Sequence, residues 1–270
     1  MAKKKIKKEV LINLPAPLSY NSWVVVGLDL STSRSGYAVG VVTETGFEVI
    51  KVGSVKPQAT SPIAPVWIRS NLTGKGLLAE ICTPVVCSLL EEGAGLLLCF
   101  EAATPRNDFL SGSRNGALTQ FFAEDSPLHK SAPAHILFVN ASTLRSLMGL
   151  TKTGSGNKKE NIAKALTFVN KDRFPEMDTD ACDGVLLMMM ARWTSALLMG
   201  RIEDVPNNVK IRLCDATQKV KGKGKRAHLV VEGVLHHPEY WTTYQKSTYG
   251  VMSKDATNPK KKLSRVDFTI

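Results

Sequence analysis

Residues 23–42 read WVVVGLDLSTSRSGYAVGVV, and this stretch decides the fold. Its first part is a run of β-branched and apolar residues that ends on Asp29, which is typical of a buried strand. A turn rich in Ser, Thr and Gly follows, and a second apolar run returns from Gly36. We therefore predict a β-hairpin, with strands over 23–29 and 36–43, that carries a carboxylate at the end of its first strand.

Three further acidic residues stand in comparable places. The run GLLLCFE, residues 95–101, is apolar up to Glu101, so we expect a strand buried on both faces that ends on this carboxylate. Asp180 and Asp183 open the long segment TDACDGVLLMMMAR, where a helix places them one turn apart on the same face. Hard divalent cations prefer such oxygen ligands. The pattern predicts a metal site formed by Asp29, Glu101, Asp180 and Asp183.

Each of these acidic residues also has a structural interpretation. An Asp after a strand is commonly a turn residue, and Asp180 is a candidate N-cap of its helix. Glu101, however, has no capping role at the end of an apolar strand, and Asp183 lies beyond the cap. The combined pattern therefore favours a metal site over four separate structural roles.

The rest of the chain indicates one α/β domain with appendages. Strands are expected over 23–29, 36–43, 46–54, 95–101 and 135–140, and helices over about 66–92, 113–123, 142–148, 160–170 and 180–199. Gly74 and Pro84 interrupt the first helix, and Ser142 caps the third. We predict an α/β fold with a mixed five-stranded sheet flanked by helices. The chain divides into a basic N-terminal arm (1–20), a central domain (21–200) and a basic C-terminal extension (201–270).

The positive charge of the chain lies at its two ends. The formal net charge is +11, and residues 10–200 hold 16 basic and 16 acidic residues. Residues 1–9 hold five Lys and one Glu, whereas residues 201–270 hold fourteen basic and seven acidic residues. A neutral core flanked by arms that bind a polyanion explains this distribution, and merely solvated termini are the alternative.

The C-terminal extension contains a predicted hairpin arm. The strand-like runs VKIRLCDATQ and RAHLVVEGVLHH flank the basic, Gly-punctuated segment 219–226. We expect its tip to contact DNA phosphates independently of sequence, through Lys221, Lys223, Lys225 and Arg226. The aromatic residues that follow either stack on unpaired bases or form a small satellite core; they are Tyr240, Trp241, Tyr244 and Tyr249.

Cysteine use and hydropathy indicate a reducing, cytoplasmic setting. The five cysteines are odd in number and include no C-x-x-C pair, which argues against structural disulfides and structural zinc. The most apolar stretch, 184–199, is interrupted by Arg192 and is shorter than the roughly 20 residues that a bilayer requires. The basic start of the chain has no apolar segment of signal-peptide length behind it. We expect no membrane partner.

Residues 23–200 resemble the RuvC-like Holliday junction resolvases, nucleases of the ribonuclease H-like superfamily. The likeness rests on the segments 27–38 and 180–184, on the strand that ends at Glu101, and on the loop that holds Gly154, Ser155 and Lys158. It implies a ribonuclease H-like nuclease domain over 21–200 and a Mg²⁺-dependent endodeoxyribonuclease of DNA recombination and repair. The substrate class is branched DNA, either four-way junctions or flaps.

The chemistry that this resemblance implies is phosphodiester hydrolysis with two Mg²⁺ ions, or Mn²⁺ in their place, about 4 Å apart. Asp29 would bridge the two ions, while Glu101 and the Asp180/Asp183 pair would each complete one side. The family's loop lysine lies near the scissile phosphate, where Lys158 or Lys159 would neutralise the developing charge. The basic residues assigned to DNA binding in this domain are Arg106, Arg114, Arg145, Lys158 and Lys159.

The resemblance also implies a homodimer, because a four-way junction has two symmetric strands to cut. The helices near 66–92 and 112–124 would provide the contact. A bacterial cytoplasm or a phage-infected host cell is the expected location, with a nucleus or organelle left open.

Two features depart from the family. The aromatic wedge that follows the strand Glu in many resolvases is replaced here by Ala102, Ala103 and Thr104, and Phe109 is the nearest aromatic residue. The extension after residue 200 has no counterpart in compact bacterial members and looks like those of phage-encoded or divergent relatives. Two other functions stay open: a non-catalytic nucleic-acid-binding protein on the same fold, and an actin-like ATPase or sugar kinase, which would need a second phosphate hairpin.

Overall fold

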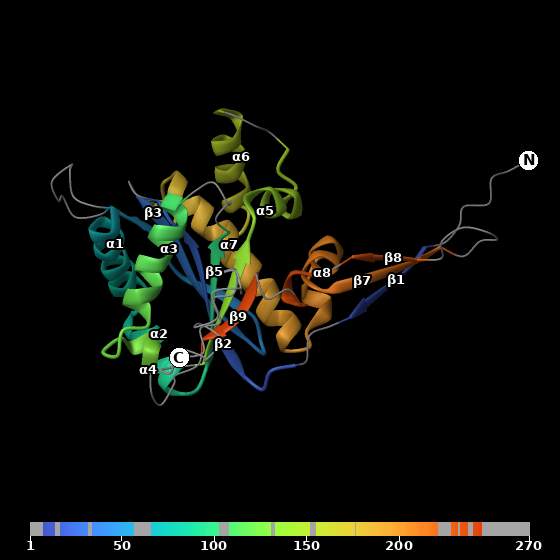
Figure 1. The fold of residues 1–270 in the computed structure, drawn as a ribbon, viewed down its shortest axis with the longest axis horizontal. Helices are drawn as coiled ribbons and strands as arrows, with labels where there is room; N and C mark the ends of the chain where they lie inside the picture. Colours follow the sequence, from blue (N-terminus) through green and yellow to red (C-terminus); the bar gives the residue numbers. More distant parts are fainter. Residues whose placement is uncertain are drawn as a thin grey trace, which may run out of the picture.

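The computed structural model describes residues 8–13, 17–31, 34–56, 66–102, 108–130, 133–151, 155–175, 177–220, 228–231, 233–236 and 240–244. Its centre is a mixed six-stranded sheet in the order β4-β3-β2-β5-β6-β9, flanked by helices (Figure 1). The predicted α/β class is confirmed, with one strand more than the five expected. The strands are β2 (Ser22–Asp29), β3 (Ser35–Thr43), β4 (Phe47–Val55), β5 (Gly95–Glu101), β6 (Ala134–Val139) and β9 (Trp241–Tyr244).

The sheet combines a meander with parallel strands. β2, β3 and β4 pair antiparallel, so the predicted hairpin forms, with Asp29 opposite Gly36. β5 runs parallel to β2, and β6 runs parallel to β5, with Glu101 opposite Val139. Because parallel neighbours end at the same edge of a sheet, the carboxyl ends of β2 and β5 carry Asp29 and Glu101 side by side.

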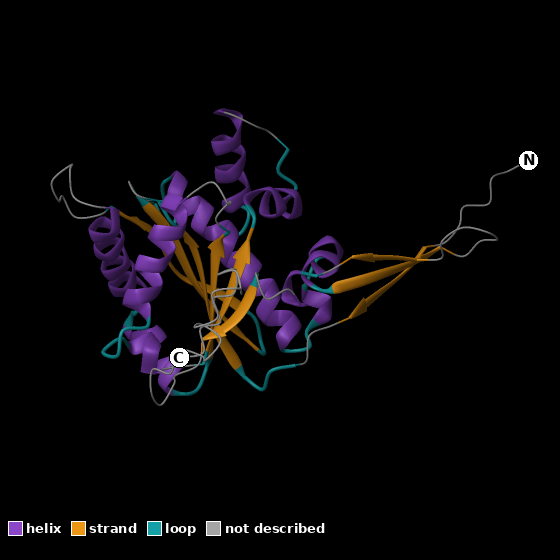
Figure 2. Cartoon of the chain, viewed as in Figure 1, coloured by secondary structure: helices purple, strands orange, loops and turns teal. Residues whose placement is uncertain are grey.

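Each face of the sheet has its own apolar core. Helices flank the strands of the sheet (Figure 2). Successive side chains of β2 alternate between the two cores: Trp23 and Val25 enter one, and Val24 and Val26 enter the other. The second core includes buried side chains of helices α1 (Val66–Ile81), α2 (Pro84–Glu91), α3 (Asp108–Phe121) and α4 (Pro127–Lys130). The first includes those of α5 (Ala141–Met148), α6 (Ser155–Ala165), α7 (Thr179–Leu198) and α8 (Asn207–Leu213).

Helix α7 lies directly on the backbone of the hairpin. A Cβ atom on Gly27 would come 2.1 Å from the backbone N of Met188, and one on Gly36 would come 1.7 Å from the carbonyl O of Asp180. Only glycine permits this approach. The helix is long and apolar enough to cross a membrane, but 89% of its apolar window is buried within the protein, as in the core helix of a globular domain. The close contact fixes the first turn of α7 beside the end of β2.

Several helix boundaries differ from the prediction. The helix expected over 66–92 divides at Thr83, whose hydroxyl accepts a hydrogen bond from the backbone N of Val86 and so caps α2. Gly74 does not interrupt α1, and it lies where α1 packs closely against Ala117 of α3. Asn140, and not Ser142, occupies the N-cap position of α5. Helix α6 begins at Ser155, within the segment expected to be a loop.

A second, three-stranded sheet pairs a strand near the N-terminus with two strands that follow α8, and it extends away from the main body (Figure 1). It contains β1 (Lys8–Asn13), β7 (Asp215–Val220) and β8 (His228–Val231), all antiparallel in the order β1-β7-β8. The predicted hairpin is thus present as β7 and β8. The first run, however, begins as α8, because Val209 and Leu213 recur at helical spacing and are both fully buried. The tip, residues 221–227, lies outside the described residues.

Strand β9 returns from the extension to the main sheet, where it pairs antiparallel with β6. The sequence analysis missed this strand. The Trp241 ring stacks on His135 of β6 at 5.4 Å between centroids, and Asn140 Nδ2 donates to the Tyr240 hydroxyl at 3.2 Å. These two aromatics pack against the main core, and not in the separate satellite core that was expected. The side chain of Tyr244 and all of Tyr249 lie outside the described part of the chain.

Candidate active site

The carboxyl group of Asp29 is the centre of the site. It lies at the end of β2 and is partly buried. Burial, followed by the negative charges of Asp183, Glu101 and Asp180, raises the pKa of Asp29 to about 8. All four acidic residues singled out in the sequence therefore lie within electrostatic reach at one edge of the sheet.

Glu101 and Asp183 share this environment. Burial raises the pKa of Glu101, and the charge of Asp183 adds to the effect. Burial also raises the pKa of Asp183, but a hydrogen bond from Asn161 and the positive charges of Lys158 and Arg145 oppose the rise. The carboxylates thus repel one another, and the cationic and amide groups of α5 and α6 relieve part of that repulsion.

Asp178 caps the helix that carries Asp180 and Asp183. Its carboxylate accepts a hydrogen bond from the backbone N of Ala181 at 2.9 Å, so Asp178 is the N-cap and the capping role considered for Asp180 is wrong. Burial alone would raise the pKa of Asp178, but its hydrogen bonds from Ala181, Ser54 and Arg34 lower it below the usual value. The cap leaves Asp180, in the first turn, without a capping role.

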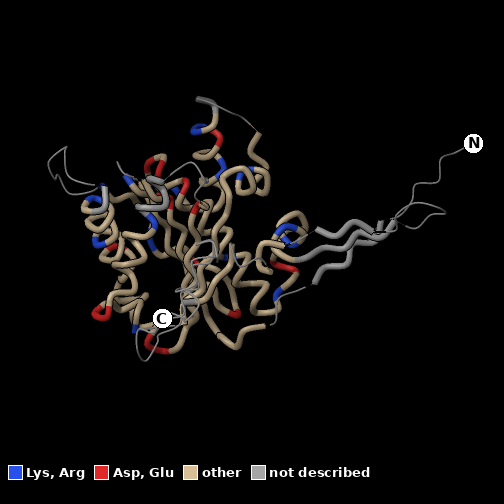
Figure 3. The backbone as a smooth tube through the Cα atoms, viewed as in Figure 1, with Lys and Arg blue, Asp and Glu red and all other residues tan. Residues whose placement is uncertain are grey.

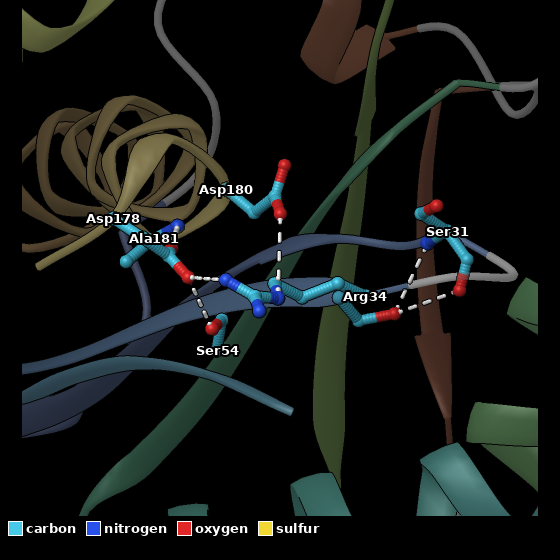
Figure 4. A network of polar contacts seen from close by, with 7 residues as sticks. Ser31, Arg34, Ser54, Asp178, Asp180 and Ala181 are labelled. Atoms are coloured by element: carbon cyan, nitrogen blue, oxygen red, sulfur yellow. Dashed lines mark hydrogen bonds and ion pairs between the residues drawn. The ribbon is translucent and has the colours of Figure 1, made fainter. Parts of the chain in front are cut away.

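Arg34 connects the hairpin to this helix end, as Figure 4 shows. Its Nη1 lies 2.5 Å from Asp178 Oδ2, and its Nε lies 4.0 Å from Asp180 Oδ2. Ser54 of β4 donates to the same Asp178 oxygen at 2.7 Å. At the base of the turn, Ser35 Oγ accepts from the backbone N of Ser31 and donates to its carbonyl. Strands β3 and β4 and helix α7 are thereby held together beside the acidic cluster.

The basic residues of the prediction differ in their surroundings. Lys158 and Lys159 are exposed on α6, where Figure 3 shows basic positions close to acidic ones, and the charge of Lys158 reaches Asp183. Arg145 is engaged by other side chains, since Nη1 donates to Asn161 at 3.1 Å and Nη2 lies 3.4 Å from Glu160. The Arg114 guanidinium lies 4.7 Å from the ring centroid of Phe138. Arg106, Lys221, Lys223, Lys225 and Arg226 lie outside the described residues, as does the side chain of Phe109.

The oxygen-only donor set suits a hard divalent cation. As the side chains lie, no three or more His, Cys, Asp or Glu residues among those described are close enough together to hold a metal ion. Burial raises the pKa of the neighbouring Cys182 thiol to about 11, so this thiol is protonated at neutral pH. The repulsion that helps to raise the pKa of Asp29 is a cost that a bound cation would offset, and carboxylate oxygens are the ligands that Mg²⁺ and Mn²⁺ prefer.

Three residues of the site have no counterpart in the sequence analysis: Arg34, Asn161 and Asp178. Asp178 could have been found, because it directly precedes the helix and has the short polar side chain that N-caps favour. Arg34 is the sole charge between Asp29 and Gly36, which is a weaker signal. Asn161 carries no signal at all, since its role depends on the packing of α6 against α7.

Comparisons with known proteins give structural likeness only. No protein-family model matches the chain, and no curated protein matches it in sequence. The solved structure of RuvC from Thermus thermophilus has a TM-score of 0.42 at 12% identity, covering 67% of this chain and 96% of that one. The structure of T. thermophilus RuvC in complex with a Holliday junction substrate has a TM-score of 0.39 at 11% identity, with the same coverage. Similarity at this level does not indicate a function, which we infer instead from the residues of the site.

Proposed function

We propose that this chain is a divalent-metal-dependent endonuclease that cuts branched DNA, with four-way junctions as its main substrate. The observation that carries the proposal is that three further carboxylates lie within electrostatic reach of the partly buried Asp29. A cluster of like charges at a strand edge destabilises the fold unless opposite charge offsets the repulsion. Divalent cations that take part in phosphoryl chemistry would supply that charge.

The residues of the chain have distinct roles in this reaction. When bound, divalent cations supply the activation of the attacking water and the neutralisation of the leaving 3′ oxygen. Asp29 is the central ligand, because the other three carboxylates all act on it. Glu101 approaches from β5, and Asp180 and Asp183 approach from α7. Exposed on α6, Lys158 is available to a substrate phosphate near Asp183, where its charge stabilises the transition state.

Asp29→Asn tests this assignment. We expect the variant to lose Mg²⁺-dependent cleavage of four-way junctions while its DNA affinity stays equal or improves, because the lost negative charge no longer repels phosphate. Asp183→Asn should behave in the same way. Asp125→Asn, an exposed carboxylate in the turn before α4, is the matched control and should cut like wild type.

Substrates and outcomes can be separated in the same assay. Labelled four-way junctions, flaps and linear duplexes are incubated with Mg²⁺ and with EDTA. Near wild-type cleavage by the Asp29→Asn variant would refute the site. Binding without cleavage by the wild-type protein would identify a non-catalytic nucleic-acid-binding protein on the same fold.

A further inference from the structure

The side-chain amide of Asn161 links Asp183 of the site to the guanidinium group of Arg145. Its Nδ2 donates to Asp183 Oδ1 at 2.6 Å, and its Oδ1 accepts from Arg145 Nη1 at 3.1 Å. Both ends of the amide are therefore occupied. Turning the amide over would place its NH₂ group against the guanidinium and its carbonyl against the carboxylate, so a single orientation is stable.

Arg145 is itself held in place. Its Nη2 lies 3.4 Å from Glu160 Oε2, and Glu160 Oε1 accepts from the backbone N of Thr151 at 3.0 Å. The side chains of Arg145 and Glu160 are only 20% and 19% exposed, so solvent screens the pair less than it would on an open surface. A continuous chain of hydrogen bonds thus runs from α5 and the loop after it, through α6, to Asp183 on α7.

We propose that Asn161 is a positioning residue for Asp183, and that Arg145 acts through Asn161 by fixing its amide. The inference rests on the proposed function, in which Asp183 is a cation ligand. An amide is suited to this task because it donates a hydrogen bond without adding positive charge. A Lys or Arg in its place would form an ion pair with Asp183 and compete with the cation for the carboxylate.

This arrangement assigns separate roles to two residues on the same side of α6. Lys158 and Asn161 are three positions apart, which places them one turn from each other on one face. Lys158 is exposed and available to the substrate, whereas Asn161 is partly buried and turned toward Asp183. Loss of Lys158 should therefore weaken the action on DNA, while loss of Asn161 should weaken the binding of the cation.

The direct test is calorimetric titration of Mn²⁺ into the full-length protein without DNA. We expect Asn161→Leu to weaken Mn²⁺ binding by roughly 10- to 100-fold, which is the usual effect of removing a group that orients a metal ligand. The Mg²⁺ concentration for half-maximal junction cleavage should rise in parallel. Asn115→Leu removes an exposed amide from α3 and should leave both values unchanged.

A double-mutant cycle tests whether Arg145 acts on Asp183 through Asn161. Arg145→Met should weaken Mn²⁺ binding in the wild-type background and have no further effect in the Asn161→Leu background, because its influence passes through the amide. Arg145→Met also provides the test if Asn161→Leu does not fold. Asn161→Gln retains the amide and should restore part of the affinity.

The outcomes separate the two proposals. A wild-type protein that neither binds Mn²⁺ nor cuts DNA overturns the proposed function. A wild-type protein that binds Mn²⁺, together with an Asn161→Leu variant of equal affinity, overturns the positioning role and leaves the nuclease intact. Additive effects of Arg145→Met and Asn161→Leu would show that Arg145 does not act through Asn161.

Discussion

At the scale of single residues, the charge on Asp29 that the proposed function requires lowers the stability of the metal-free protein. Its folded-state pKa of about 8 lies above the ordinary value, so the free energy of unfolding falls as the pH rises from about 4 through 8 in the absence of metal. We predict that metal-free Asp29→Asn is more stable than wild type at pH 8.5, by at least about 1.4 kcal/mol, the equivalent of one pKa unit.

Urea denaturation in EDTA at pH 5 and pH 8.5 measures this difference. The advantage of the Asn variant should be smaller at pH 5, where the native carboxyl group is still protonated. An equal difference in unfolding free energy at the two pH values would mean that the pKa of Asp29 is not raised in the folded protein. Added Mg²⁺ should stabilise the wild-type protein more than the variant, because the cation binds the folded state through this carboxylate.

The predicted proximity of residues holds where a residue stands out from its neighbours along the chain. Asp29 and Glu101 are conspicuous because each is the charge that ends an apolar strand, and parallel pairing of β2 with β5 then places them together. Asn161 and Arg34 are ordinary polar residues in sequence. Their partners lie 22 and 144 positions away, so only the packing of α6 and of the hairpin against α7 reveals them.

At the scale of elements, the contact between α7 and the hairpin decides whether the site assembles. We predict that Gly27→Ala costs at least roughly 2 kcal/mol, because the new methyl group would overlap the backbone of α7 and push the helix from β2. Gly46→Ala, in the turn before β4, is the matched control, since a Cβ there meets nothing within 4 Å.

Thermal and urea denaturation of the two glycine variants give the comparison. Gly46→Ala should stay within about 0.5 kcal/mol of wild type, as expected for a surface substitution. Gly27→Ala should also lower the affinity for Mn²⁺, because a displaced α7 carries Asp180 and Asp183 with it. A fully stable Gly27→Ala protein would contradict the close contact.

Helices and strands were predictable where an apolar pattern extends over many residues. Strands were missed where they depend on pairing with a strand far away in the sequence. β2, β5 and α7 follow from their apolar runs. β9 has four residues, and its assignment depends on β6, about 100 residues earlier in the chain. β1 is equally dependent on β7. Helix α8 was misjudged because its buried positions, Val209 and Leu213, are too few to distinguish a helix from a strand.

At the scale of the whole molecule, the C-terminal extension is partly core and partly arm. Val209 and Leu213 are fully buried and β9 completes the main sheet, so removing residues 201–270 would disturb folding as well as DNA binding. A sharper variant replaces Lys221, Lys223, Lys225 and Arg226 with Gln. We predict weaker binding to all DNA forms and a shallower dependence of log affinity on log salt, by about 0.9 for each cation that contacts a duplex phosphate.

Binding titrations over a series of salt concentrations measure that slope. An equal number of Lys→Gln changes at exposed positions on the main domain, such as Lys56 and Lys130, distinguishes the arm from a general loss of charge. An unchanged slope in the arm variant would assign the segment a different task.

We also predict a homodimer that makes paired nicks across a four-way junction, because two symmetric strands require two active sites related by a two-fold axis. Residues 10–200 carry no net charge, so little electrostatic repulsion opposes their association. Light scattering gives the mass, and cleavage of a cruciform extruded from a supercoiled plasmid reports whether both strands are cut in one encounter. A monomer that releases singly nicked product would indicate a general structure-selective nuclease.

The pairing of β1 with β7 determines when β1 can join its sheet during synthesis of the chain. Lys8 pairs with Val220, so the first strand to leave the ribosome must wait for nearly the whole chain before its partner is made. Contacts of such long sequence separation form late, because closing a long loop is entropically costly. Strands β2 to β6 and helix α7 are therefore all synthesised before β7, and a polypeptide that stops short of β7 keeps β1 as an unpaired strand, open to association with other chains.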